Sequence, residues 1–223
     1  MLKQATYSLF SLLLLFVLAA CGAGPEGEEV ESGEAIEGDG ETTTMAAATF
    51  NVDASASNIT WEGTKKIGGG HNGNISIADG SLAVVDGKLN AGVFTIDMTS
   101  ITNTDLPEDK GAMLVGHLSN EDFFEVETYP TAQFEIKNVT PASGRDDITH
   151  MITGNLTMKD STRSVSIPAL VEMTEDQISA TTPAFVINRT EWGIKYGSGL
   201  LGLAEDEIIN DNIGLEITLV ANR

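Results

Sequence analysis

The chain has 223 residues, of which 33 are Asp or Glu and 12 are Lys or Arg, so its formal net charge is −21 at pH 7. This length suits one domain or two small ones. Because phosphate binding needs clustered Lys and Arg, the charge argues against nucleic acid and against an anionic membrane surface. One Cys and three His exclude an intrachain disulfide and a thiolate zinc site. We therefore expect neither a cofactor nor a metal.

The N-terminus has the pattern of a lipoprotein signal peptide. Lys3 precedes an apolar run over residues 9–20, which is too short to span a bilayer core but fits the apolar region of a signal peptide. The run ends in Leu-Ala-Ala-Cys at residues 18–21, which resembles the bacterial lipobox. We expect residues 1–20 to be a removed lipoprotein signal peptide and Cys21 to be the lipidation site. The alternative is an ordinary signal peptide that has a Cys near its cleavage site.

The lipobox implies a location. The mature protein would be anchored by lipid to a membrane of the bacterial cell envelope, either facing the periplasm or at the outer membrane or cell surface.

Residues 22–48 are acidic and poor in apolar side chains. They include eight Asp or Glu, no Lys or Arg and no aromatic residue. Such a stretch buries too little apolar surface to offset the entropy lost on ordering. We therefore expect residues 21–48 to form a lipidated, acidic, disordered tether that holds a folded domain, residues 49–223, away from the membrane.

From Thr49 onward the pattern changes to short alternating runs between turn residues, which is typical of an antiparallel sheet with one buried face. Turn residues at 78–80, 85–87, 143–144 and 174–176 separate successive runs. The predicted fold class is all-β, an extended, lipocalin-like barrel of about eight strands, because closure removes exposed sheet edges. A two-sheet sandwich stays open as the alternative. The predicted strands are 59–64, 73–78, 81–85, 88–98, 131–140, 150–159, 163–173, 177–187 and 213–221.

A long break, residues 103–129, interrupts the strands. Its apolar residues Met113, Leu114, Leu118 and Phe123 sit near helical spacing, so we expect a short helix that caps one end of the barrel. Phe123 and its neighbour Phe124 would then plug that end.

Several literal motif matches carry no function. Gly68, Gly70 and Gly73 satisfy the glycine pattern of dinucleotide-binding proteins, but the residues that follow alternate like a strand instead of opening a helix. The three His residues, His71, His117 and His150, lie in separate elements and are best interpreted as surface or hydrogen-bonded side chains. No Ser, His and carboxylate share a catalytic motif, so we expect no enzyme.

Six motifs resemble those of the YceI-like family, in the family's order, across residues 49–223. The most distinctive pair is Phe-Phe-x-Val followed by Tyr-Pro-x-Ala-x-Phe. The motifs are His-x-Gly-x-Ile at 71–75, the segment 96–101, the distinctive pair at 118–126 and 129–134, Gly-x-Leu-Thr within 154–159, and Asn-Arg-x-x-Trp-Gly-Ile at 188–194. The stretch 196–212 is longer and more acidic than the link that many members have before the last strand.

The resemblance implies a lipocalin-like barrel that holds a long isoprenoid or similar amphipathic lipid in an apolar channel, without catalysis. We therefore favour a membrane-anchored binding or carrier protein for such a lipid. The alternative is a filled barrel that presents acidic loops to a protein partner, and a hydrolase ranks last. A homodimer also stays open. The candidate channel-lining residues are Phe94, Ile96, Phe134, Ile136, Ile152, Leu156, Met158, Val165, Ile167, Phe185, Ile187, Leu215 and Ile217.

Overall fold

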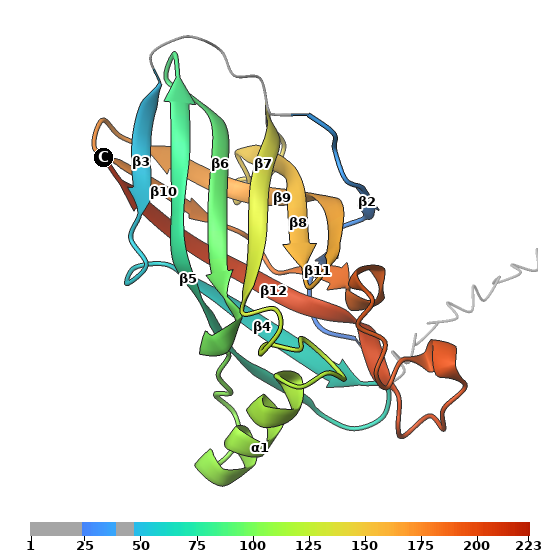
Figure 1. Cartoon of the computed structure of the whole chain (residues 1–223). Coiled ribbons are helices and arrows are strands. Elements are labelled where there is room, and N and C mark those ends of the chain that lie inside the picture. Colours follow the sequence, from blue (N-terminus) through green and yellow to red (C-terminus); the bar gives the residue numbers. More distant parts are fainter. Residues whose placement is uncertain (1–23, 39–46) are drawn as a thin grey trace, which may run out of the picture.

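The computed structural model describes residues 24–38 and 47–223, and it consists mostly of β-strands (Figure 1). Eight antiparallel strands pair in a closed ring, which confirms the predicted all-β barrel. The ring closes because β4 pairs with β5 on one side and with β12 on the other. Its strands, in ring order, are β4 (Asn58–Lys65), β5 (Gly70–Val85), β6 (Lys88–Asp97), β7 (Thr131–Pro141), β8 (His150–Met158), β9 (Ser161–Met173), β10 (Gln177–Thr181) and β12 (Ile209–Asn222).

Shorter elements complete the fold. β3 (Ala48–Val52), which the sequence pattern did not reveal, pairs with β5 and β12 at one end of the ring. β11 (Phe185–Asn188) pairs with the middle of β12. Two further strands, β1 (Glu28–Glu29) and β2 (Ser32–Glu34), precede the ring. The helical elements are α1 (Glu108–Leu118) and the 3-10 turns η1 (Met98–Ser100), η2 (Arg189–Trp192) and η3 (Gly199–Leu201).

Two of the predicted strand boundaries are wrong. The expected turn at residues 78–80 is a register shift between Ile77 and Asp79, so β5 bends there without reversing. The predicted strand 177–187 is split into β10 and β11, and the gap contains Pro183, which has no N–H to donate to a sheet. In contrast, Asp86 and Gly87 both adopt positive φ, at 52° and 71°, and form the expected β5–β6 hairpin turn.

The two ends of the ring differ. At the end that carries β3 and the C-terminus, Phe50, Leu82 and Ile178 are buried and form a packed core. The opposite end carries α1, which lies within the predicted break and confirms the short helix (Figure 1). Met113, one of the residues whose spacing predicted this helix, has a side chain that is 70% exposed. Phe123 is buried at this end, as expected.

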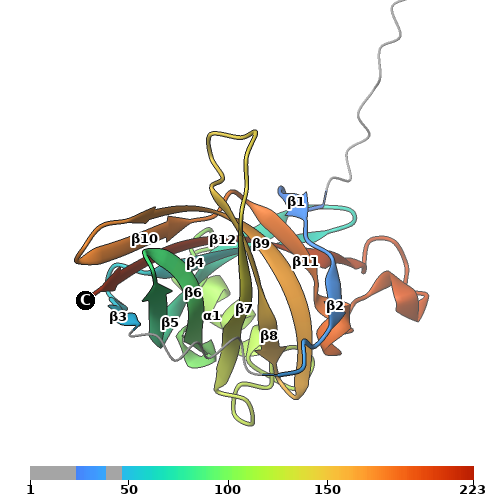
Figure 2. The same cartoon turned by 90° about the horizontal axis from the view of Figure 1, so that it is seen from above.

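The expectation of a disordered tether is wrong for residues 24–38, which we call the strap. β1 pairs in parallel with β11, and β2 pairs antiparallel with β9 (Figure 2). Between them, the N–H of Val30 donates to Val186 O at 2.9 Å, and the Val30 side chain is buried in the core. The acidic composition misled the prediction because unpaired backbone groups at a sheet edge accept an added strand whatever its side chains are. Residues 1–23, with Cys21, and residues 39–46 lie outside the described residues.

Asn155 on β8 fastens the far end of the strap. Its Oδ1 accepts a hydrogen bond from Ile36 N at 2.9 Å, and its Nδ2 donates to Ile36 O at 3.0 Å. Asn155 is buried, so neither bond is exposed to full competition from water.

We predict that Asn155→Ala loosens the strap without unfolding the ring. Each lost hydrogen bond contributes on the order of 1 kcal/mol, so amides of β2 should exchange with solvent about tenfold faster or more. Hydrogen exchange read by mass spectrometry measures this, with Asn138→Ala, a change at an exposed Asn on β7, as the matched control. Unchanged exchange in β2 of the Asn155→Ala protein would contradict the role of Asn155.

Candidate ligand-binding cavity

The ring encloses a cavity of about 1140 Å³. Pockets for drug-sized ligands usually measure about 300–1000 Å³, so this one can take a larger molecule. It extends from Ile178 and Leu219, beside the packed core, to the loops at the α1 end. Lining residues at the α1 end, such as Ile67 and Leu201, are exposed to solvent, so the cavity opens there. We call this opening the mouth.

All thirteen residues that the sequence analysis proposed as channel lining do line the cavity. Alternation explains the agreement, because every second side chain of the ring strands, and of β11 that pairs with β12, points inward. Their role in ligand binding stays a prediction. The residues are Phe94, Ile96, Phe134, Ile136, Ile152, Leu156, Met158, Val165, Ile167, Phe185, Ile187, Leu215 and Ile217.

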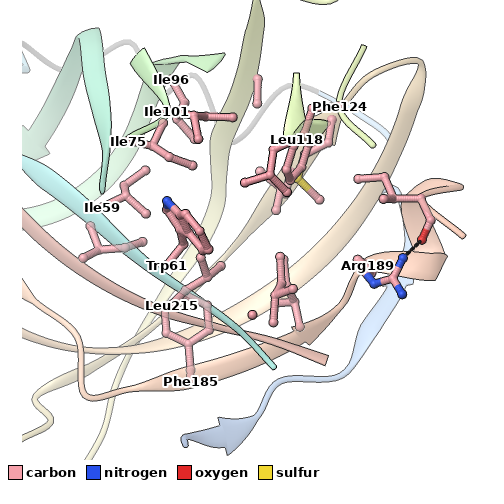
Figure 3. A pocket seen from close by; sticks show the side chains of 18 of the residues that line it. Ile59, Trp61, Ile75, Ile96, Ile101, Leu118, Phe124, Phe185, Arg189 and Leu215 are labelled. Atoms are coloured by element: carbon pink, nitrogen blue, oxygen red, sulfur yellow. Dashed lines mark hydrogen bonds between the residues drawn. The ribbon is translucent and has the colours of Figure 1, made fainter. Parts of the chain in front are cut away.

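Other residues that line the cavity were not among the thirteen proposed. Figure 3 shows Ile59, Trp61 and Ile75 pointing into the same space as Leu215, with Leu118 and Phe124 on the facing side. Ile59 and Trp61 share one face of a strand that the analysis did predict, so alternation could have identified them. Leu118 and Phe124 reach the mouth from α1 and the following loop, where the sequence analysis expected a capping helix and a plug but did not count them as lining.

Three aromatic side chains meet at the mouth. The ring of His117 lies edge-on to Phe123 and to Tyr196, with centroid separations of 5.1 and 4.9 Å. His117 Nε2 also lies 3.2 Å from Asp122 Oδ2. The cluster joins α1 to the segment that precedes β12, so two sides of the mouth contact each other.

Arg189 holds the segment between η2 and β12 in place. Its side chain donates to the carbonyl oxygens of Ile194 at 2.8 Å, Ile209 at 3.2 Å and Asn210 at 3.2 Å. It also pairs with Asp211 at 3.3 Å. Burial lowers the pKa of Arg189, and the charge of Asp211 opposes this shift. A buried guanidinium with these partners fixes both ends of the loop that borders the mouth.

The His-x-Gly-x-Ile motif has a distinct task at each position. Ile75 lines the cavity, and His71 Nδ1 lies 2.9 Å from Asp105 Oδ2 in the segment before α1. A Cβ on Gly73 would lie 1.7 Å from the carbonyl oxygen of Thr102, so only Gly allows this segment to approach β5. The N–H of Thr102 donates to Asn74 O at 2.9 Å. The motif therefore sets the position of α1 over the mouth.

Asp105 is the polar centre of this junction. Besides His71, its carboxylate accepts from the N–H of Asn72 at 3.0 Å and from Asn103 Nδ2 at 2.6 Å. Burial alone would raise the pKa of Asp105, but the hydrogen bonds from His71, Asn72 and Asn103 outweigh burial and lower it to about 2.

In ranges 24–38 and 47–223, no three His, Cys, Asp or Glu side chains group as they would around a metal ion. Within the same ranges, no helix is long and apolar enough to cross a membrane. His150, the remaining His, lies with its Nδ1 2.9 Å from Thr149 Oγ1.

Comparison with known proteins gives one family. A family model described as a YceI-like domain matches residues 50–221. No curated protein matches the chain.

Two solved structures share the fold. BcnA from Burkholderia cenocepacia is 21% identical, with a TM-score of 0.58 over 76% of this chain and 99% of its own. A polyisoprenoid-binding domain from Saccharophagus degradans, implicated in plant cell wall breakdown, is 16% identical, with a TM-score of 0.56 over 79% of this chain and 99% of its own. At these identities the likeness is evidence for the fold alone.

We predict that the charged carboxylate of Asp105 stabilises the fold at neutral pH and that this contribution is lost in strong acid. A carboxylate whose pKa is lower in the folded than in the unfolded state stabilises the fold above about pH 4, the unfolded value, and loses that contribution as the pH falls towards about 2. Asp105→Asn should therefore destabilise at pH 7 and progressively less as the pH falls. Urea unfolding at several pH values measures the difference.

The matched control for this prediction is Asp79→Asn, a change at an exposed Asp on β5, the strand that carries His71. A difference between wild type and Asp105→Asn that does not shrink below pH 4 would contradict the role of the charged carboxylate.

Proposed function

The chain belongs to the YceI-like family, and from that premise we propose that it is a membrane-anchored binding or carrier protein for a long-chain isoprenoid or similar amphipathic lipid. The resemblance drawn from the six motifs is thereby confirmed. The observation that carries the proposal is the long apolar cavity, which is packed shut at one end and open at the other.

Members of this family are binding proteins and not enzymes, so the prediction of a non-enzyme is confirmed at the level of the family. The alternative function, a filled barrel that only presents its loops, requires a packed interior. The cavity volume supports the carrier over this alternative.

Polar lining residues are concentrated at the mouth. Lys65, His71, Asp206 and Glu207 all lie there. Deeper in the cavity, the hydroxyl oxygen of Thr182 already accepts a hydrogen bond from Ile217 N at 2.9 Å. Unsolvated polar groups are costly to bury, so a ligand would place its apolar chain inside and its polar head at the mouth. This division matches an amphipathic lipid.

The anchor rests on the sequence. The Leu-Ala-Ala-Cys motif at residues 18–21 follows an apolar run and supports acylation of Cys21 in the bacterial cell envelope. Two acyl chains suffice for stable anchoring, whereas one binds a membrane only marginally. A lipid carrier held at a membrane would stay close to the source of its ligand.

We predict that Ile217→Trp blocks the cavity at little cost to folding. Ile217 lines the cavity and is only partly buried, so a larger ring would occupy ligand space. Each CH₂ group of the ligand that can no longer be buried lowers the binding free energy by about 0.8 kcal/mol. Affinity for a prenyl lipid should therefore fall about tenfold or more. Titration with a fluorescent prenyl lipid and thermal unfolding measure the two effects separately.

Thr218→Trp is the matched control, because Thr218 is exposed on the outward face of the same strand. Wild-type protein that binds no prenyl lipid would contradict the proposal. A large loss of stability in Ile217→Trp alone would show that this position is part of a packed core.

We predict that Cys21→Ser abolishes acylation. Metabolic labelling with a fatty-acid analogue should label the wild type and not the variant, because the thiol is the acceptor in the lipobox. Gly24→Ser, a change just beyond the motif, should keep the label. Label retained in the Cys21→Ser protein would refute the lipidation site.

A further inference from the structure

The mouth is bordered by an exposed apolar rim, which we define as Ile67, Tyr196, Leu200 and Leu201. These side chains are 54, 43, 73 and 58% exposed. The described residues contain eight exposed large apolar side chains, and half of them lie in this rim. Exposed apolar groups that gather in one place mark an interaction surface.

The rim is one continuous surface although its residues come from two segments. Ile67 lies between β4 and β5, and Leu200 and Leu201 lie in η3. The two segments are joined by a hydrogen bond from Lys66 N to Ile208 O, 2.9 Å, and by an ion pair from Lys66 Nζ to Glu205, 2.8 Å. Ile67, Tyr196 and Leu201 also line the cavity, so the rim continues into its apolar wall.

The strap places the lipid anchor on the same side of the molecule as the rim. The N–H of Glu26 lies 3.4 Å from Glu62 Oε2, and Glu62 is three residues before the end of β4, where the loop with Ile67 begins. Gly24 is the first described residue, so only two residues separate it from Cys21. A fully extended chain covers at most about 3.5 Å per residue, so the acyl chains attach within about 11 Å of Gly24. The strap thus leaves too little free chain to hold the rim far from a bilayer.

The charges near the rim select the kind of bilayer. Glu205, Asp206 and Glu207 follow η3, and the whole chain carries a net charge of −21. Anionic lipids would repel this surface, whereas zwitterionic lipids would not. Lys66 offsets only part of this charge, because it is paired with Glu205.

We propose that the rim inserts into a zwitterionic lipid bilayer, so that a lipid passes between membrane and cavity without crossing water. This inference rests on the proposed function for its cargo and on acylation of Cys21 for its geometry. The apolar rim, the mouth and the start of the strap all lie near the end of β4. A bilayer at this end of the molecule would contact the rim, lie over the mouth and hold the acyl chains of the anchor.

The first arm of the test measures insertion itself. The full chain is reconstituted in phosphatidylcholine vesicles that contain brominated acyl chains, which quench nearby Trp fluorescence. Leu200→Trp places a probe on the rim. Met173→Trp places the control probe at an exposed position at the end of β9, on the side of the ring away from the mouth. We expect quenching of the rim probe to exceed that of the control at least about twofold, since interfacial insertion reaches only about 5–10 Å. Equal quenching of both probes would overturn the inference.

The second arm measures transfer. Leu200→Glu should slow uptake of a fluorescent prenyl lipid from the vesicles about tenfold, because one aliphatic side chain no longer inserts into the bilayer. Met173→Glu, the control, should leave the rate of uptake unchanged. Leu200 does not line the cavity, so binding of the same lipid in detergent solution should be retained. Unchanged uptake by Leu200→Glu overturns rim insertion. Absence of lipid binding by the wild type in detergent overturns the proposed function instead.

Discussion

The pairing of β4 with both β5 and β12 closes the ring, and the cavity depends on this closure. In a closed antiparallel ring, each strand has a neighbouring strand on both sides, so the sheet has no free edge. Because the sheet curves back on itself, its inner face is covered by its own strands and can surround a space without a second sheet. An open sheet of the same strands would have to bury that face against something else.

The two ends of the ring differ, so the cavity is closed at one end and open at the other. At one end, β3 and the β5–β6 hairpin bring together Phe50, Leu82 and Ile178 in a packed core. At the other end, backbone approach at Gly73 and the hydrogen bonds of Asp105 hold α1 over the mouth. Arg189 holds the facing loop. Polar contacts thus build the end that opens and apolar contacts build the end that stays shut, which suits a container filled from one side.

The strap connects this container to its surroundings. It adds strands to β9 of the ring and to β11 beside it, at backbone groups that no other strand pairs, and it buries Val30 there. Its acidic side chains stay at the surface, and Glu28 pairs with Arg145 at 2.7 Å. The same residues that look like a solvated linker in composition therefore fix the point at which the chain leaves the ring. That point lies beside β4 and β12, since Glu26 contacts Glu62 on β4 and Pro25 lies next to Gly214 on β12.

The sequence by itself determined the all-β class, most of the ring strands and all thirteen proposed lining residues, because a period of two places every second side chain on one face. It also revealed the short helix and the family. Tertiary structure decided the features that depend on distant segments: the bulge that replaces a turn after Ile77, the capture of the strap by β9 and β11, and the contacts of Arg189 with residues 194 and 209–211. Tertiary structure also decided that the interior is open. Apolar side chains alternate in the same way around a packed core and around a cavity, and only the closed geometry of the ring sets how much space they must fill.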